Sequence, residues 1–120
     1  MASAFAHFAA GAALWPLFRT AAARPATWVV GATLAAAPDL DVIGFGFGVA
    51  YGDLLGHRGL THSLFVAAIV GAALSFALRR ARSTARDQLQ IAAYLFLATA
   101  SHGLLDAMTT GGLGVALLAP

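Results

Sequence analysis

The residues best suited to chemistry in this sequence are histidines and aspartates, and one pair of them stands four positions apart. His102-Gly-Leu-Leu-Asp106 closes an apolar segment, and residues at i and i+4 of a helix project from the same face. An imidazole and a carboxylate placed in this way are able to bind one divalent metal ion. The same spacing also suits an ordinary His–Asp hydrogen bond inside a helical bundle, so both interpretations stay open.

A second polar run, HRGLTHS, covers residues 57–63. His62 enters the apolar segment that follows, where an unpaired imidazole is costly, and we predict it as a metal ligand. His57 is either a catalytic group or a loop histidine. Arg58 either holds an anionic group of a substrate or pairs with an aspartate. Thr61 or Ser63 is suited to cap the helix that follows.

Two further carboxylates lie in the run PDLD at residues 38–41. Helix capping after the proline accounts for one of them, but neighbouring carboxylates repel each other unless a cation lies between them. We therefore predict Asp39 as a metal ligand or a catalytic group, and Asp41 as a catalytic group. His7, in the first apolar segment, is the last candidate ligand, although a lone histidine there is more often a hydrogen-bonded core residue.

Nitrogen and oxygen ligands without sulfur suit zinc, manganese or iron. The chain has no cysteine, which excludes thiolate sites and disulfides. A divalent metal with an open coordination position would lower the pKa of a bound water towards about 7, and a neighbouring aspartate could then act as a general base. We expect a divalent metal cofactor, zinc before manganese or iron.

Four apolar segments must position these side chains. Each is near the ~20 residues that cross a hydrocarbon core. They cover about residues 4–18, 26–50, 62–78 and 89–106. Pro38 is expected to break the second segment, and the apolar stretch 113–120 is too short to span. We predict a single all-α domain over residues 1–120, an integral membrane bundle of four transmembrane helices with a truncated fifth as an option.

Composition favours a membrane protein and excludes some partners. Hydrophobic residues make up 60% of the chain and charged residues 10%, whereas a soluble domain carries roughly 25% charge. The formal charge of +2 is too small for a nucleic-acid-binding surface, so no nucleic acid partner is expected. No lysine or arginine precedes the first apolar segment, so we interpret that segment as a retained helix and not as a cleaved signal peptide.

The arginines predict an orientation in the membrane. Six of the seven, Arg19 among them, lie in the two loops that alternate crossing puts on one side, and the positive-inside rule makes that side cytoplasmic. At 1.5 Å per helical residue, the histidines and aspartates of all four segments lie roughly 18–30 Å from this plane. We therefore expect one polar layer near the outer face.

The order of these motifs is similar to that of a known family. The motifs are His7, APDLD at 37–41, HRGLTHS at 57–63, and SHGLLD at 101–106 followed by Thr109, Thr110 and Gly111. Together they resemble the YdjM-like family of bacterial and archaeal inner-membrane proteins, described as metal-dependent hydrolases. The resemblance covers essentially the whole chain, and it implies a protein that continues past Pro120.

The ligand order is also similar, more distantly, to that of zinc-dependent phospholipase C and the related single-strand nucleases. This likeness implies four metal ligands and a further ligand or general base at Asp39 or Asp41. The four are His7, His62, His102 and Asp106. The chain has no glutamate and no tryptophan at its start, so the three-metal site of those enzymes is not expected here.

These features predict a membrane-embedded metal-dependent hydrolase, multi-pass in a bacterial or archaeal inner membrane, with its site at the outer membrane–water boundary. The expected partner is the lipid bilayer, and the expected substrate is a phospholipid or a lipid-linked phosphate. One alternative is a protein that binds or transports metal ions or protons without catalysis, because intramembrane ionisable residues also mark ion pathways. Another is a structural or partner-binding membrane protein whose polar cluster only joins its helices.

Overall fold

The protein is represented by a computed structural model that describes residues 3–18, 20, 24–110, 112 and 114–120. The described residues form α-helices and 3-10 helices and contain no β-strand, which confirms the all-α class. The α-helices are α1 (Ala4–Leu14), α2 (Pro25–Ala36), α3 (Leu64–Ala77) and α4 (Ala85–Ala107). The 3-10 helices are η1 (Trp15–Leu17), η2 (Ala37–Phe47) and η3 (Leu60–His62).

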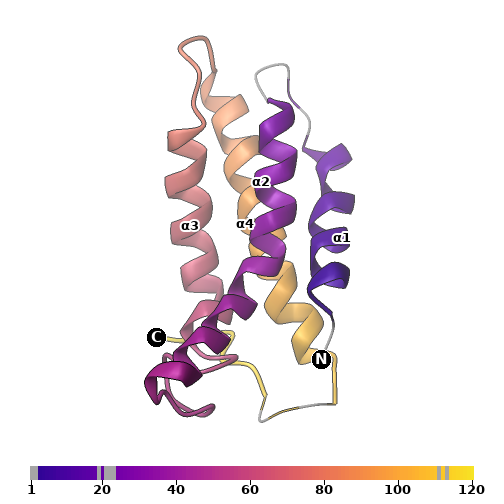
Figure 1. Cartoon of the computed structure of the whole chain (residues 1–120). Coiled ribbons are helices and arrows are strands. Elements are labelled where there is room, and N and C mark those ends of the chain that lie inside the picture. The colour runs from indigo at the N-terminus through magenta and orange to yellow at the C-terminus, as the bar shows by residue number, and fades with distance from the viewer. Residues whose placement is uncertain (1–2, 19, 21–23, 111, 113) are drawn as a thin grey trace.

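The four α-helices run side by side along the long axis of the molecule (Figure 1). α1 and α2 pack against each other, both contact α4, and α3 packs on the other side of α4. The loop that joins α3 to α4 lies at one end of the bundle (Figure 1). The segment after η2, the start of α1 and the C-terminal residues all lie at the other end, so any site formed there draws on every part of the chain.

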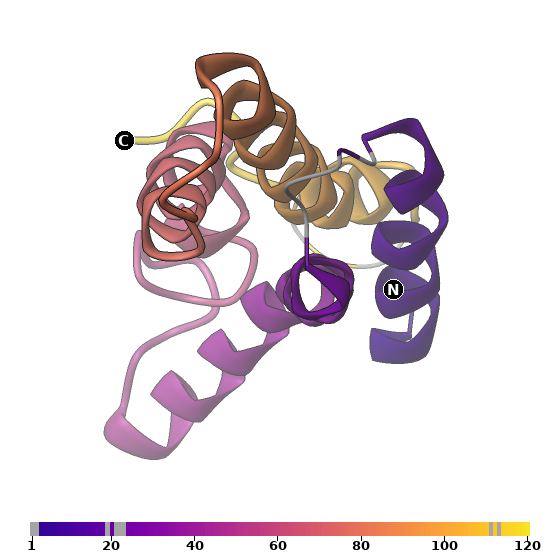
Figure 2. The ribbon, with the colours of Figure 1, turned by 90° about the horizontal axis from the view of Figure 1, so that it is seen from above.

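The second apolar segment changes its helix type at the predicted break. α2 ends at Ala36 and the chain continues as η2, with Pro38 in its first turn. Proline has no N–H to continue the α-helical hydrogen bonds, and its ring crowds the preceding turn. Seen from above, η2 leaves the axis of α2 and points away from the bundle (Figure 2). It ends at Gly48, whose φ of 82° is a left-handed conformation that glycine adopts without strain.

Small residues let the helices approach closely. A Cβ added at Gly31 of α2 would collide with the ring of Tyr94 in α4, and one added at Gly11 of α1 would lie 2.6 Å from Ala35 Cβ. The Tyr94 hydroxyl lies within hydrogen-bonding distance of two backbone carbonyl oxygens, 3.2 Å from Gly11 and 3.0 Å from Trp28. Tyr94 thereby joins α4, which carries His102, to α1, which carries His7, and to α2, which leads directly into η2 and Asp39.

α4 begins with a capping box. The Thr84 hydroxyl accepts the backbone N–H of Asp87, and the Asp87 carboxylate accepts the backbone N–H of Thr84. The backbone hydrogen bond from Thr84, followed by that from its hydroxyl, lowers the pKa of the Asp87 carboxyl below its ordinary value. From this cap α4 runs for 23 residues, or about 34 Å at 1.5 Å per residue.

The all-α class is confirmed, but the prediction of four transmembrane helices is not and stays a prediction. Among the described residues, one helical stretch, Pro25–Phe47, is long and apolar enough to cross a membrane. The apolar helices Ala4–Leu17 and Leu64–Ala77 are shorter, and α4 has the length but not the hydropathy. Arg19, on which the predicted orientation partly depends, and Gly111 lie outside the described residues.

The outer surface of the bundle is nevertheless strongly apolar. Large side chains on different elements are exposed to 72% or more, among them Phe5, Phe47, Phe76 and Met108. Water disfavours such a surface, whereas lipid covers it at no cost. The long axis of 45 Å also matches the ~40–45 Å thickness of a bilayer with its headgroups.

Candidate metal centre

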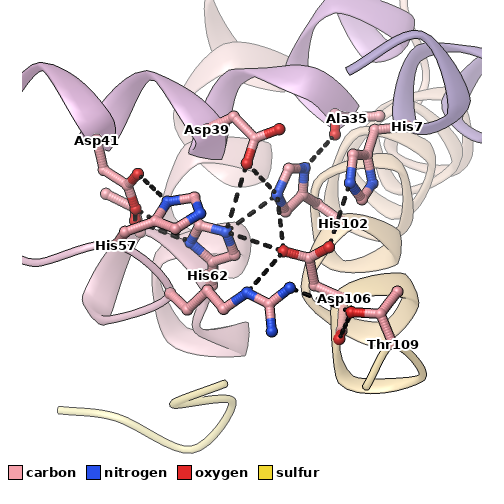
Figure 3. A network of polar contacts seen from close by, with 11 residues as sticks. His7, Ala35, Asp39, Asp41, His57, His62, His102, Asp106 and Thr109 are labelled. Carbon is pink, nitrogen blue, oxygen red and sulfur yellow. Dashed lines mark hydrogen bonds and ion pairs between the residues drawn. The ribbon is translucent and has the colours of Figure 1, made fainter. Parts of the chain in front are cut away.

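All eight predicted site residues lie in one network at the end of the bundle where η2 leaves α2 (Figure 3). They come from α1, η2, the 57–59 turn, η3 and α4, segments that are far apart in the sequence. The residues are His7, Asp39, Asp41, His57, Arg58, His62, His102 and Asp106. Apart from the partly exposed Asp39, their side chains are almost fully buried.

Four of these residues direct one atom each towards a common point. The Nε2 atoms of His62 and His102 are 3.0 Å apart, and Asp39 Oδ1 lies 3.3 Å from the latter. Asp106 Oδ2 lies 3.8 Å from His62 Nε2 and 3.9 Å from His102 Nε2. Ligands bound at ~2.0–2.1 Å to a tetrahedral zinc lie about 3.4 Å from one another. The four atoms therefore have the spacing of a metal site.

The hydrogen bonds of the two histidines indicate which nitrogen of each is free to bind. His102 Nδ1 donates to the Ala35 carbonyl oxygen at 2.7 Å. His62 Nδ1 lies 3.3 Å from Asp41 Oδ2 and 3.1 Å from the Thr61 hydroxyl, which itself donates to Asp41. A neutral imidazole with its proton on Nδ1 has a lone pair on Nε2. Two lone pairs thus face each other at 3.0 Å, an arrangement that a shared cation stabilises.

Pro38 removes one donor that would compete with His102 for the Ala35 carbonyl. In the 3-10 pattern that starts at Ala37, the carbonyl of residue 35 would accept the N–H of residue 38. Proline has no N–H, and His102 Nδ1 donates to this carbonyl. The break at Pro38 thus lies next to both Asp39 and the acceptor that orients His102.

Carboxylate oxygens at the centre accept no hydrogen bond from the described residues. Within the described residues, Asp39 Oδ1 and both side-chain oxygens of Asp106 are buried without a hydrogen bond. Arg58 Nε forms an ion pair with Asp106 Oδ2 at 3.2 Å, but its alignment is not that of a hydrogen bond. Buried, unsatisfied oxygens are rare because each costs about 1–3 kcal/mol or more. A metal ion between Asp39 and Asp106 would satisfy Asp39 Oδ1 and Asp106 Oδ2, whereas Asp106 Oδ1 faces His7 Nε2 at 3.5 Å.

A second group, Asp41, His57 and His62, also has the spacing of a metal site, but both oxygens of the Asp41 carboxylate already accept hydrogen bonds. Asp41 Oδ1 accepts from His57 Nδ1 at 2.7 Å, and Asp41 Oδ2 accepts from the Thr61 hydroxyl at 2.7 Å. Metal-binding histidines commonly donate their other N–H to such a carboxylate. We therefore interpret Asp41 as the residue that orients His62, outside the centre formed by the four atoms.

His7 lies beside this centre. Its ring stacks on that of His102 with centroids 3.7 Å apart, and its Nε2 lies 3.5 Å from Asp106 Oδ1. The side chain is fully buried, and neither nitrogen has a hydrogen bond to the described residues. His7 is not among the atoms grouped around the common point, so its predicted role as a ligand stays a prediction.

Arg58 connects the centre to the C-terminal segment. Its Nη2 donates to the Thr109 hydroxyl at 3.1 Å, while its Nε faces Asp106. Its φ of 69° is left-handed, a conformation that costs a residue with a Cβ roughly 1–2 kcal/mol. A strained backbone that buries a guanidinium beside a carboxylate is typical of a functional position.

Sequence reasoning missed several groups that complete the site. Thr61 was considered only as a helix cap, although its hydroxyl contacts both Asp41 and His62. No pattern of side chains in the sequence predicts that the Ala35 carbonyl accepts a hydrogen bond from His102. Tyr51, whose ring lies 5.4 Å from that of His57, gave no distinct signal because tyrosine is common wherever a chain meets the membrane–water interface.

A bundle with an apolar exterior and a buried polar cluster is typical of helical membrane proteins. The chain belongs to the YdjM inner membrane protein family, whose model matches residues 1–120. The family membership predicted from the motifs is thereby confirmed, together with the class of inner membrane protein.

A curated relative agrees with this family. The chain is 50% identical over 84 residues to inner membrane protein YbcI of Escherichia coli (strain K12). The match covers 68% of this chain and 46% of that protein, so the chain spans about half the length of this relative. No solved structure matches. Neither description names a metal or a reaction, so the zinc, the hydrolase activity and the likeness to phospholipase C stay predictions.

Proposed function

We propose that this protein is a metal-dependent hydrolase that acts on a phosphoester at the membrane–water boundary. The observation that carries the proposal is the pair of Nε2 lone pairs of His62 and His102, 3.0 Å apart. Beside them, oxygens of Asp39 and Asp106 are buried without a hydrogen bond to the described residues. A cluster that only joined helices would satisfy its own hydrogen bonds, as the neighbouring Asp41 carboxylate does. The unsatisfied atoms of this cluster support a bound cation.

The ligand set suits catalysis if one position stays open. His62, His102 and Asp106 are buried and held by second partners, whereas the side chain of Asp39 is 23% exposed. We assign the first three as permanent ligands and Asp39 as a fourth ligand or as the general base. A divalent metal held there would supply Lewis acidity and an ionised water as nucleophile.

The surrounding residues of the chain hold this arrangement. Asp41 keeps the proton of His62 on Nδ1, and Ala35 does the same for His102, so both Nε2 atoms stay available. Arg58 partly neutralises Asp106, which limits repulsion between that carboxylate and an approaching phosphate. The phosphoester class follows from the oxygen- and nitrogen-rich metal site beside a buried arginine, a combination that suits anionic oxygen.

The first test is the metal content of detergent-purified protein by mass spectrometry. Wild type is compared with His102→Ala and with Thr99→Ala, a control in the same helix whose hydroxyl contacts only the Leu95 carbonyl. We expect about one or more transition metal ions per chain in wild type and the control, and loss of the metal from His102→Ala, since one missing ligand weakens a four-ligand site severely.

Turnover then separates the alternatives. A metal-loaded protein that hydrolyses phosphoesters in mixed micelles is an enzyme. A metal-loaded protein without turnover that moves ions in proteoliposomes is an ion-handling protein. Folded wild type without metal, even after incubation with zinc or manganese, would sink the hydrolase proposal, because a proton shared between His62 and His102 would then be the cation.

A further inference from the structure

A cavity of about 520 Å³ lies against the candidate metal centre. It is formed by the loop before η3 and by the C-terminal segment. Its lining includes Tyr51, His57, Arg58, Gly59, Gly114 and Val115. Its volume lies in the range of about 300–1,000 Å³ that is typical of sites for small ligands. Because His57 and Arg58 also belong to the polar network, the cavity and the centre share a wall.

Two polar atoms in this wall are buried without a partner among the described residues. They are His57 Nε2 and the Tyr51 hydroxyl oxygen. The rings of Tyr51 and His57 meet edge to face with centroids 5.4 Å apart. Polar groups buried in a native structure are almost always hydrogen-bonded. Two orphaned atoms on neighbouring residues that line one cavity therefore point to a ligand that completes them.

Gly112 brings the guanidinium of Arg58 to the same place. The φ of Gly112 is +92°, and a Cβ added to it would collide with the Tyr51 hydroxyl and lie 3.0 Å from Arg58 Nη1. Only glycine lets the C-terminal segment lie this close to both side chains. The Tyr51 hydroxyl and Arg58 Nη1 therefore lie close to each other beside Gly112.

The hydrogen-bonding directions define the chemistry of the ligand. His57 Nδ1 donates to Asp41, so His57 Nε2 carries a lone pair and accepts a proton. The Tyr51 hydroxyl and the Arg58 guanidinium are donors. A phosphate monoester in its monoanionic form has one P–OH and two oxygens that share its single negative charge. These groups match one acceptor and two donors, whereas a diester has no P–OH. The only carboxylate in the lining, Asp53, is exposed and already accepts the Ala50 N–H.

We propose that this cavity binds the phosphate of a phosphate monoester beside the metal centre. In this arrangement the P–OH donates to His57 Nε2, and the anionic oxygens accept from Tyr51 and Arg58. That this ligand is the substrate rests on the function proposed above. The binding itself uses residues outside the four-atom centre, so it is measurable with and without metal.

The test measures binding to detergent-purified protein by isothermal titration calorimetry, with phosphonate analogues that cannot be hydrolysed. The lipid probe is the phosphonate analogue of dihexanoyl phosphatidic acid, the soluble probe is 3,4-dihydroxybutyl phosphonate, and dihexanoylglycerol is the neutral reference. Each is titrated into metal-loaded and chelator-treated protein. A lipid headgroup as the source predicts tighter binding of the lipid probe, and a soluble phosphate ester predicts equal binding of both probes.

The variants are chosen in matched pairs. Tyr51→Phe removes one hydroxyl, and we expect affinity to fall about tenfold, as is usual for a hydrogen bond to a charged group. Its control is Tyr94→Phe, a hydroxyl that contacts carbonyls of α1 and α2. Gly112→Ala adds a Cβ between Tyr51 and Arg58, and the measured quantity is again the phosphonate affinity. Its control is Gly46→Ala, where an added Cβ meets nothing within 4 Å.

The outcomes separate this inference from the proposed function. Phosphonate binding that falls in Tyr51→Phe but not in Tyr94→Phe supports the cavity site, whether or not the protein holds metal. Binding of dihexanoylglycerol as tight as that of the phosphonates, no binding of either phosphonate, or equal affinities in wild type and Tyr51→Phe would overturn it. In that case a metal-loaded, hydrolytically active wild type would leave the proposed function intact.

Discussion

Each histidine of the centre has two nitrogens with separate tasks. In both His62 and His102, Nδ1 contacts a fixed acceptor while Nε2 faces the common point. The acceptors differ in strength, because His102 uses a neutral carbonyl and His62 uses the Asp41 carboxylate. An ionised acceptor gives roughly twice the hydrogen-bond strength of a neutral one. The site therefore depends on Asp41 even though Asp41 is not one of the four central atoms.

This dependence predicts the effect of Asp41→Asn. The amide keeps the shape but loses the charge that holds His62 and His57, so we expect metal affinity to fall about 10–100-fold while the metal still binds at saturation. Competition with a chelator of known affinity measures this change. The matched control is Asp87→Asn, in the capping box of α4. An affinity equal to that of wild type would remove Asp41 from the support of the site, and complete loss of metal would make it a ligand.

At the scale of the elements, the site depends on how closely α1, α2 and α4 pack. Gly11 and Gly31 provide the room, and Tyr94 fills it with a ring and a hydroxyl that contacts backbone oxygens of both neighbouring helices. In lipid, where no hydrophobic effect drives one helix onto another, such close packing is a main source of association. The distance between His7 on α1 and His102 on α4 thus follows from contacts about one turn away on α1 and about two turns away on α4.

We therefore expect Gly31→Ala to destabilise the bundle. The added Cβ collides with the Tyr94 ring, and overpacking of this kind costs typically about 1–3 kcal/mol. Thermal unfolding in detergent, followed by circular dichroism, should show a lower midpoint than in Gly46→Ala, the open-space control. Equal midpoints for the two variants would contradict the packing of Tyr94 against Gly31.

At the scale of the whole molecule, the segment after η2 and the C-terminal segment lie at one end of the bundle, and the α3–α4 loop lies at the other (Figure 1). These two segments line the cavity, and the first of them carries His57 and Arg58 of the polar network. Four of the seven arginines, Arg79, Arg80, Arg82 and Arg86, belong to that loop or to the start of α4. If the bundle crosses the membrane, these arginines favour the cytoplasmic side for their end. The site would then open towards the outer face.

This orientation is testable because the chain has no cysteine of its own. Gly52→Cys places a thiol in the loop at the site end, where an added Cβ meets nothing within 4 Å. Arg82→Cys places a thiol in the α3–α4 loop at the opposite end. With an impermeant maleimide on intact cells, we expect Gly52→Cys to react at once and Arg82→Cys only after lysis. The reverse pattern would invert the orientation and leave the geometry of the site unchanged.

The sequence by itself determined the all-α class, the family and the set of residues at the site. Its apolar segments are local properties of composition, and His102 and Asp106 share a helix face because of the fixed helical repeat. The motif order was enough to indicate the family. Each of these inferences depends on residues close together in the chain or on their order, and none depends on how distant segments meet.

The tertiary structure alone decided how the residues divide their roles. Asp39 faces the centre and Asp41 lies behind His62, because α2 changes into η2 at Pro38 and turns the two carboxylates to different sides. The hydrogen bond from His102 to the Ala35 carbonyl, the stacking of His7 on His102 and the cavity beside Arg58 join segments dozens of residues apart. Such contacts depend on the packing of helices and on the path of the backbone after a helix ends, and local sequence patterns do not encode either.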